Sequence, residues 1–331
     1  MGGLGTRLKE RTRATPKPLL DVGGRPFLEY LLDEAARQSF TEILLLAGHL
    51  GDQVRNLYHG RKWGRAQIRV LCEPEPLGTG GALRFALPHL APQFLLANGD
   101  SFFDINLRAL ATFLPNGGAA MALRNVAGDR YGRVRLDGER VLSFHAPQEG
   151  VSGPINGGIY ALSRAVVESI PPGKISLEGE MFPPLAARDG IRGREFDGYF
   201  IDIGVPQDLE RAQTDLPRHV RRPAVFFDRD GVLNRDIGYL HRPEEFEWLQ
   251  GAKAAIRHCN DAGYFVFVVT NQAGVARGYY DESDVEKLHA WIGAELAREG
   301  AYIDAFEYCP HHLDGVRPEY RRVCPRRKPE P

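Results

Sequence analysis

The chain has 331 residues, of which 43% are hydrophobic and 26% charged, and its formal net charge is -1. This length predicts two domains, and the composition is that of a globular protein with enough apolar side chains for two cores. The near-zero charge argues against a global basic field, so neither nucleic acid nor an anionic membrane surface is an expected partner.

Cysteines are sparse, and none follows a secretory signal; they are Cys72, Cys259, Cys309 and Cys324. We therefore expect free thiols in a reducing compartment, which predicts a cytoplasmic protein. The longest apolar runs, at residues 43–47 and 264–269, are too short to cross a bilayer and suit buried strands.

Short apolar runs alternate with amphipathic segments along the chain, which predicts α/β folds with parallel sheets. Strands are expected at residues 42–46, 68–72, 94–97, 119–123, 155–162, 195–201, 224–227, 264–270 and 305–308. Helices are expected at residues 27–38, 80–87, 207–214, 252–262 and 284–299. The Arg/Pro-rich stretch 216–223 predicts a linker between a domain at 1–215 and a domain at 224–331.

A glycine-rich loop opens the chain, with Lys17 a short distance behind it. The loop residues of interest are Gly2, Gly3, Gly5, Thr6 and Arg7. Glycines let backbone N–H groups approach triphosphate oxygens without a Cβ in the way, although a plain turn is the alternative for the glycines alone. Arg7 and Lys17 can neutralise phosphate charge, so both are candidate catalytic residues.

Together with residues 15–20, this loop resembles the signature of sugar-1-phosphate nucleotidylyltransferases. Further segments resemble that family in the same order along the chain, namely 73–82, 98–100, 156–160, 176–178 and 200–204. The resemblance covers residues 1–213 and implies a Rossmann-like nucleotidyltransferase domain. Details at 130–132, 155–158 and 200–204 look closest to the D-glycero-D-manno-heptose 1-phosphate guanylyltransferase branch.

The resemblance also implies roles for individual residues. Nucleotide contacts are implied for Glu73, Leu77, Gly78 and Thr79, and sugar or phosphate contacts for Asn156, Gly157 and Glu178. Asp100 and Asp202 correspond to the family's metal ligands, and both follow predicted strands. A sugar phosphate oxygen attacking an α-phosphorus needs in-line positioning and charge neutralisation, which one Mg²⁺ between these carboxylates would provide.

This half departs from the family pattern in two places. The family has an apolar strand before the glycine loop, whereas Met1 here lies almost on the loop, so we expect a domain lacking its first strand. Many relatives carry Glu-Lys-Pro at a sugar-phosphate contact where this chain has His145-Ala146-Pro147. His145 is therefore an alternative phosphate ligand.

The second half opens on an apolar strand that runs into Asp228 and Asp230. Residues at i and i+2 of a strand point to the same side, and the carboxyl end of a sheet is where α/β proteins bind ligands. The motif resembles that of HAD phosphohydrolases. It implies that Asp228 attacks phosphorus, that Asp230 acts as acid and base, and that both carboxylates bind Mg²⁺. An acidic strand-ending turn is the alternative.

Later segments resemble D-glycero-D-manno-heptose 1,7-bisphosphate 7-phosphatase from residue 223 onward. Thr270 and Asn271 correspond to its phosphate-binding step, and Lys328 to the lysine that stabilises the aspartyl-phosphate. The family's Asp-rich loop would follow residue 331, so we expect an incomplete HAD-like Rossmannoid domain with weak phosphatase activity.

Zinc is a separate question in this half. The phosphatase family often holds Zn²⁺ with Cys-x-His and Cys-x-Cys, matched here by Cys309, His311 and Cys324. Arg326 stands where the last thiolate belongs, although His312 could substitute. Structural zinc prefers four closed protein ligands, so the sequence does not favour bound zinc.

The two halves together predict a bifunctional enzyme. The second half would convert heptose 1,7-bisphosphate into heptose 1-phosphate, which the first half would join to a nucleotide from a nucleoside triphosphate, with GTP favoured. Alternatives are mannose 1-phosphate or another base for the transferase, a histidinol-phosphatase-like activity for the second half, and a fragment that only binds ligands. The oligomeric state is left open.

Overall fold

The computed structural model describes residue 8 and residues 11–126, 130–148 and 150–330. The chain folds as two compact units, unit 1 (Met1–Ala36 and Phe40–Arg221) and unit 2 (Arg37–Ser39 and Arg222–Pro331). The predicted glycine-loop residues Gly2, Gly3, Gly5, Thr6 and Arg7 lie outside the described residues. In the part of the chain that is described, no helix is long and apolar enough to cross a membrane.

Unit 1 is a mixed α/β structure. Its helices are α1 (Phe27–Arg37), α2 (Gly51–Tyr58), α3 (Gly78–Ala86), α4 (Leu107–Ala111), α5 (Arg164–Glu168), α6 (Phe182–Ala187) and α7 (Pro206–His219), with short turns η2 (Lys17–Leu19), η3 (Leu87–His89) and η4 (Leu177–Met181). Its strands are β1 (Asp21–Val22), β2 (Arg25–Pro26), β3 (Glu42–Ala47), β4 (Lys62–Trp63), β5 (Ala66–Cys72), β6 (Gln93–Ala97), β7 (Ser101–Phe103), β8 (Ala119–Val126), β9 (Arg133–Asp137), β10 (Arg140–His145), β11 (Gly153–Ser163), β12 (Ile191–Glu195) and β13 (Phe200–Asp202).

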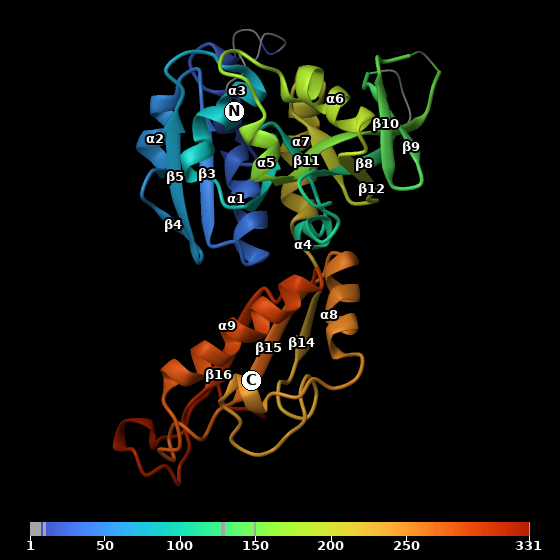
Figure 1. Ribbon diagram of the computed structural model, residues 1–331. Coiled ribbons are helices and arrows are strands. Elements are labelled where there is room, and N and C mark those ends of the chain that lie inside the picture. The colour runs from blue at the N-terminus through green and yellow to red at the C-terminus, as the bar shows by residue number, and fades with distance from the viewer. Residues whose placement is uncertain (1–7, 9–10, 127–129, 149, 331) are drawn as a thin grey trace. The chain divides into compact units, whose positions relative to one another are not determined.

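The strands of unit 1 form two larger sheets, of order β3-β5-β4 and β6-β11-β8-β12-β10-β9 (Figure 1). β3 and β5 pair in parallel, as do β8 and β12, but the other pairs of the six-stranded sheet are antiparallel. The prediction of parallel sheets is therefore wrong for most of this sheet. The short turn between β9 and β10 explains part of the difference, because a tight hairpin can only join antiparallel strands.

The core of unit 1 lies against the six-stranded sheet. Met121 and Leu123 of β8 are fully buried, and they pack in one cluster with Tyr160 of β11 and Phe182 of α6. A second cluster joins α7 to the β7–β13 pair through Phe102, Ile201 and other apolar side chains. These two clusters support the strand ends that carry the polar residues of the first candidate site.

The predicted strand at 195–201 is wrong, because β12 ends at Glu195 and β13 begins at Phe200. The chain turns between them at Gly198, where a Cβ would lie 1.6 Å from the carbonyl oxygen of Asp104. Only glycine fits such a close backbone approach. The apolar run thus serves two strands rather than one.

The predicted linker at 216–223 is also wrong at its start, because α7 continues to His219. Leu209, Ala212 and Leu216 are all buried and form one stripe along this helix. Burial of that stripe outweighs the helix-breaking tendency of Pro217, which lies in the last turn. The connection to the next strand is therefore 220–223.

Unit 2 is a βαβαβ arrangement. Its elements are β14 (Ala224–Phe227), η5 (Pro243–Glu245), α8 (Ala252–Asp261), β15 (Phe265–Asn271), α9 (Glu282–Arg298), β16 (Ala305–Cys309) and η6 (Pro318–Tyr320). The strands form an all-parallel sheet of order β14-β15-β16, with both helices alongside it (Figure 1). Parallel pairing is what the alternation of strand and helix predicted for this half.

Burial along β15 alternates strictly, so the two faces of this sheet differ. Val266 and Val268 are fully buried in one cluster with Ile256 of α8 and Ile292 of α9. On β14, by contrast, Phe226 is 66% exposed, and its ring stacks on that of Phe267 at 5.1 Å. The core of unit 2 therefore lies between the helices and the face of the sheet that carries the two valines.

Candidate functional sites

The first site lies where β7 pairs with β13. The register places Asp202 opposite Ser101, directly beside Asp100. The Lys17 ammonium lies 2.6 Å from Asp100 Oδ2 and 3.8 Å from Asp202 Oδ1. The structure thus brings together three predicted residues that lie far apart in the sequence. Two carboxylates converging on one cation form the kind of oxygen-rich site that binds Mg²⁺.

Asp202 is the more constrained of the two carboxylates. Burial raises its pKa above the ordinary value, and the nearby Asp100 raises it further, while Lys17, the Gly204 N–H and Arg130 lower it. The Gly204 N–H donates to Asp202 Oδ1 at 2.7 Å. Its carboxylate is therefore held in one orientation by a fixed backbone group.

Arg130 is a member of this site that sequence reasoning missed. Its guanidinium donates to Asp202 Oδ2 at 2.9 Å and also bonds Asp208, in the first turn of α7. The Arg-Tyr-Gly sequence at 130–132 resembles the guanylyltransferase branch, but this resemblance does not indicate what the arginine does. That role depends on Asp208, which lies 78 positions away along the chain.

The predicted nucleotide loop forms a compact turn at the start of α3. Glu73 Oε2 accepts a hydrogen bond from the Leu77 N–H at 3.1 Å. Gly78 has φ +72, and a Cβ there would lie 2.5 Å from the carbonyl oxygen of Ile175. Thr79 donates to Glu178 Oε2 at 2.7 Å, which joins this turn to η4. Four predicted nucleotide residues and one predicted sugar residue are therefore neighbours.

The other predicted sugar residues lie at an irregularity in β11. The register with β8 shifts between Asn156 and Tyr160, and Gly158 has φ +74. At Gly157 a Cβ would lie 2.6 Å from the Phe103 ring, so this stretch packs tightly against β7. Asn156 donates to the Tyr160 hydroxyl at 2.7 Å.

His145, the alternative phosphate ligand, ends β10 and is exposed. Its Nε2 lies 2.8 Å from the Ser143 hydroxyl on the same strand. This contact does not join it to the Lys17 cluster. The geometry therefore favours Lys17 and Arg130 as the cations of the first site.

The second site lies at the carboxyl end of β14 and β15. Asp228 Oδ2 lies 2.6 Å from the Lys328 ammonium, and Asp228 Oδ1 accepts from the Arg229 N–H at 2.7 Å. Lys328 also donates to the Val269 carbonyl oxygen at 2.8 Å. Although it lies far from Asp228 in the sequence, Lys328 is thus fixed beside the predicted nucleophile by β15.

Asp230 is surrounded by hydrogen-bond donors. The buried Arg229 side chain contacts both of its oxygens at 3.1 and 3.0 Å. Asn234 and Gln272 donate at 3.1 and 3.0 Å, respectively, and the Thr270 hydroxyl lies at 3.4 Å. Such a carboxylate is locked in position, which suits a group that must meet a leaving oxygen in one geometry.

Thr270 and Asn271 follow each other on β15 but have different surroundings. Thr270 is buried beside Asp230, whereas the Asn271 amide makes two reciprocal bonds at 3.1 Å with the Lys328 backbone. In this arrangement Asn271 holds the lysine segment in place. The Asn271 amide would therefore have to bind phosphate while it is also hydrogen-bonded to the Lys328 backbone.

The predicted zinc residues also converge. The ligand atoms of Cys309, His311 and Cys324 all lie within 4.8 Å of one another. Burial raises the pKa of the Cys309 thiol and lowers that of His311. His312 is engaged elsewhere, since its Nδ1 accepts the Asp314 N–H. Within the described ranges the group has three members, so a closed site of four protein ligands is not formed.

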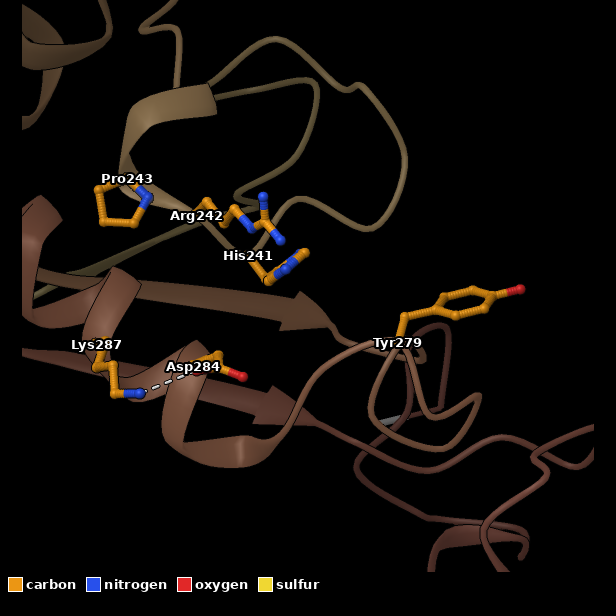
Figure 2. A pocket seen from close by; sticks show the side chains of 6 residues that line it. All are labelled: His241, Arg242, Pro243, Tyr279, Asp284 and Lys287. Carbon is orange, nitrogen blue, oxygen red and sulfur yellow. Dashed lines mark hydrogen bonds and ion pairs between the residues drawn. The ribbon is translucent and has the colours of Figure 1, made fainter.

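An open surface pocket of about 350 Å³ lies beside the second site and was not predicted. Figure 2 shows its lining: His241, Arg242, Pro243, Tyr279, Asp284 and Lys287. His241 stacks on the Tyr280 ring at 4.8 Å, and the Tyr280 hydroxyl donates to Gln272, which contacts Asp230. The Tyr280 ring therefore lies between His241, which lines the pocket, and the Asp230 network.

Comparison with known proteins connects this geometry to two groups of enzymes. The family model described as nucleotidyl transferase matches residues 1–219. D-glycero-alpha-D-manno-heptose 1-phosphate guanylyltransferase of Campylobacter jejuni is 37% identical over 213 residues, covering 62% of this chain and 93% of that protein. The crystal structure of HddC from Yersinia pseudotuberculosis complexed with GMP-PN superposes with a TM-score of 0.59 and 30% identity, covering 65% of this chain and 96% of that one.

A further relative is D-glycero-beta-D-manno-heptose-1,7-bisphosphate 7-phosphatase of Rhodopseudomonas palustris. It is 51% identical over 111 residues, which cover 34% of this chain and 62% of that protein. The chain thus spans about three fifths of the length of this phosphatase. The chain belongs to the nucleotidyl transferase family. This assignment rests on the family model that matches residues 1–219, on the guanylyltransferase relative and on the similarity of fold.

Proposed function

We propose that unit 1 transfers GMP from GTP to heptose 1-phosphate and releases pyrophosphate. The sugar phosphate oxygen attacks the α-phosphorus, and the bond from that phosphorus to the β-phosphate oxygen breaks. The observation that carries the proposal is the convergence of Asp100, Asp202 and Lys17 at one pair of strand ends. The Campylobacter relative and the HddC complex support GTP as the nucleotide.

Each group of residues has a task in this reaction. Asp100 and Asp202 would hold Mg²⁺, which when bound neutralises phosphate charge. Lys17 and Arg130 supply fixed positive charge beside the carboxylates. The turn from Glu73 to Thr79 is assigned to the nucleotide, together with the glycine loop, and Asn156, Gly157 and Glu178 are assigned to the sugar.

The choice of nucleotide and sugar is tested by supplying the full chain with each nucleoside triphosphate and heptose 1-phosphate, and measuring pyrophosphate. We expect the highest kcat/KM with GTP. Mannose 1-phosphate serves as the competing sugar. A higher kcat/KM with mannose 1-phosphate than with heptose 1-phosphate would overturn the proposed substrate.

We propose that unit 2 is a HAD-type phosphatase that acts on the 7-phosphate of heptose 1,7-bisphosphate. The phosphatase match has about the length of unit 2, and the Asp228–Lys328 pair supports this assignment. A carboxylate oxygen of Asp228 attacks phosphorus, the bond from phosphorus to the sugar oxygen breaks, and Asp230 protonates that oxygen. Asp230 then takes a proton from the water that hydrolyses the aspartyl-phosphate, and phosphate leaves.

The sharpest test of unit 2 is the phosphoenzyme, because it does not require fast turnover. With substrate labelled in the 7-phosphate, acid-quenched full-length protein should carry label on Asp228. Asp228→Asn should carry none, and Lys328→Met should carry at least about 10-fold less because the ammonium no longer neutralises the new charge. Label that persists in Asp228→Asn would place the nucleophile elsewhere.

Zinc is not part of the proposal, because structural zinc prefers four protein ligands and this cluster offers three among the described residues. We place the domain boundary within residues 220–223, after α7. We propose that unit 2 supplies the heptose 1-phosphate that unit 1 uses, which favours joining both units in one chain. The phosphatase relative is named for the beta anomer and the guanylyltransferase relative for the alpha anomer, so this link requires unit 2 to act on the alpha anomer. We propose that both act in the cytoplasm, where nucleoside triphosphates are made.

A further inference from the structure

Tyr160 is a fully buried tyrosine whose hydroxyl lies between two residues assigned to the sugar. It belongs to β11, is 0% exposed, and its ring packs on Phe182 at a centroid distance of 5.0 Å. A buried hydroxyl needs hydrogen-bond partners, because an unpaired one loses its contacts with water. The identity of those partners defines what the residue does.

The partners of the hydroxyl are Asn156 and Glu178. Asn156 Oδ1 accepts the Gly158 N–H at 2.9 Å, which turns the amide nitrogen toward Tyr160, and that nitrogen donates to the hydroxyl oxygen at 2.7 Å. The hydroxyl proton is then left for Glu178 Oε1, at 3.5 Å. The directions of both hydrogen bonds therefore follow from the backbone at Gly158.

The other end of Glu178 is held from the nucleotide turn. Its Oε2 accepts from the Thr79 hydroxyl at 2.7 Å, and Thr79 in turn accepts the Leu177 N–H at 2.8 Å. Burial, followed by the charge of Glu178, raises the pKa of Tyr160 well above its ordinary value, so the hydroxyl keeps its proton. The chain of bonds from Asn156 to Thr79 is thus continuous.

We infer that Tyr160 is a positioning residue for the sugar phosphate: its buried hydroxyl orients Asn156 and Glu178 without touching the substrate. The inference rests on the proposed transferase function and deepens it. Without the hydroxyl, the Asn156 amide and the Glu178 carboxylate each lose a partner and gain rotational freedom. Substrate binding must then order them, which weakens binding of the sugar but leaves the nucleotide unaffected.

The test is Tyr160→Phe in the full-length chain, which keeps the ring that packs on Phe182. Initial rates of pyrophosphate release are measured with each substrate varied at saturating levels of the other. We expect the KM for heptose 1-phosphate to rise about 10-fold and the KM for GTP to stay within about twofold. Tyr199→Phe is the matched control, because the buried Tyr199 hydroxyl has no hydrogen-bond partner among the described residues.

A double-mutant cycle separates positioning from a general loss of structure. In an Asn156→Ala background, Tyr160→Phe should raise the sugar KM much less than it does in the wild type. Additive effects, equal changes in both KM values, or an unchanged sugar KM would each overturn the inference. If the wild type prefers another sugar 1-phosphate, the heptose assignment fails, while the same comparison with that sugar still tests Tyr160.

Discussion

At the scale of single residues, the first site is a balance of charges around Asp202. Burial and Asp100 oppose its ionisation, and Lys17 and Arg130 favour it. Arg130 is held by a second carboxylate, Asp208, so the guanidinium keeps its place beside Asp202. A fixed cation of this kind can bind phosphate oxygens without the reorganisation that a mobile side chain would need.

Arg130→Ala tests that role. We expect kcat/KM for pyrophosphate release to fall about 10- to 100-fold, because a charge-assisted hydrogen-bonding group is lost. Asp208→Asn should cause a smaller loss, since it leaves the guanidinium present but less well held. Arg124→Ala is the control, because Arg124 pairs with the fully exposed Asp197. Activity of Arg130→Ala within about twofold of the wild type would limit Arg130 to a structural ion pair.

At the scale of elements, α7 and α9 show how local patterns compete with tertiary packing. Pro217 and the arginines after it favour a linker, yet Leu216 is fully buried in a cluster with Phe102 and Ile201. The start of α9, by contrast, is defined by a local motif. It is a capping box in which the Asp281 and Asp284 side chains each accept a hydrogen bond from the other's backbone N–H. Such a cap satisfies donors that the first turn leaves open.

Leu216→Ala tests the extent of α7. We expect the free energy of unfolding to fall by about 2–4 kcal/mol in denaturant titrations, because a fully buried leucine leaves a cavity. The exposed Arg218→Ala in the same turn should change it by less than about 0.5 kcal/mol. Equal, small effects of both substitutions would place Leu216 in a flexible linker after all.

Asp284→Asn tests the cap of α9 through its pH dependence. The Asp281 N–H, and then Lys287, lower the Asp284 pKa below its ordinary value. A lowered folded-state pKa stabilises the fold above the unfolded pKa of about 3.9, and this stabilisation is lost as pH falls through the folded value. The melting temperature of the variant should therefore be lower than that of the wild type at pH 7, and this difference in melting temperature should narrow below about pH 4. Glu286 is exposed, so Glu286→Gln should have the melting temperature of the wild type. A difference for Asp284→Asn that stays constant with pH would contradict the role of the Asp284 carboxylate in the cap.

At the scale of the whole molecule, the mixed α/β fold and most elements could be predicted from periodicity and strand-ending motifs. Asp228 and Asp230 are one example, since the apolar run before them predicted a strand, and β14 ends at Phe227, directly before Asp228. Arg130 and Tyr160 are different, because their roles depend on partners in α7 and η4 that no local pattern identifies. The mostly antiparallel sheet of unit 1 and the open pocket beside the site of unit 2 also arise from long-range packing.

The central claim is that Asp100 and Asp202 act together as the metal-binding pair of a nucleotidyl transfer site. The most direct measurement is pyrophosphate release from GTP and heptose 1-phosphate, titrated with Mg²⁺, for the wild type, Asp100→Asn, Asp202→Asn and the exposed control Asp197→Asn. We predict that the rate of pyrophosphate release falls at least about 100-fold in Asp100→Asn and in Asp202→Asn, and that it is unchanged in the control. Full activity of Asp100→Asn or Asp202→Asn at the same Mg²⁺ concentration would contradict the claim.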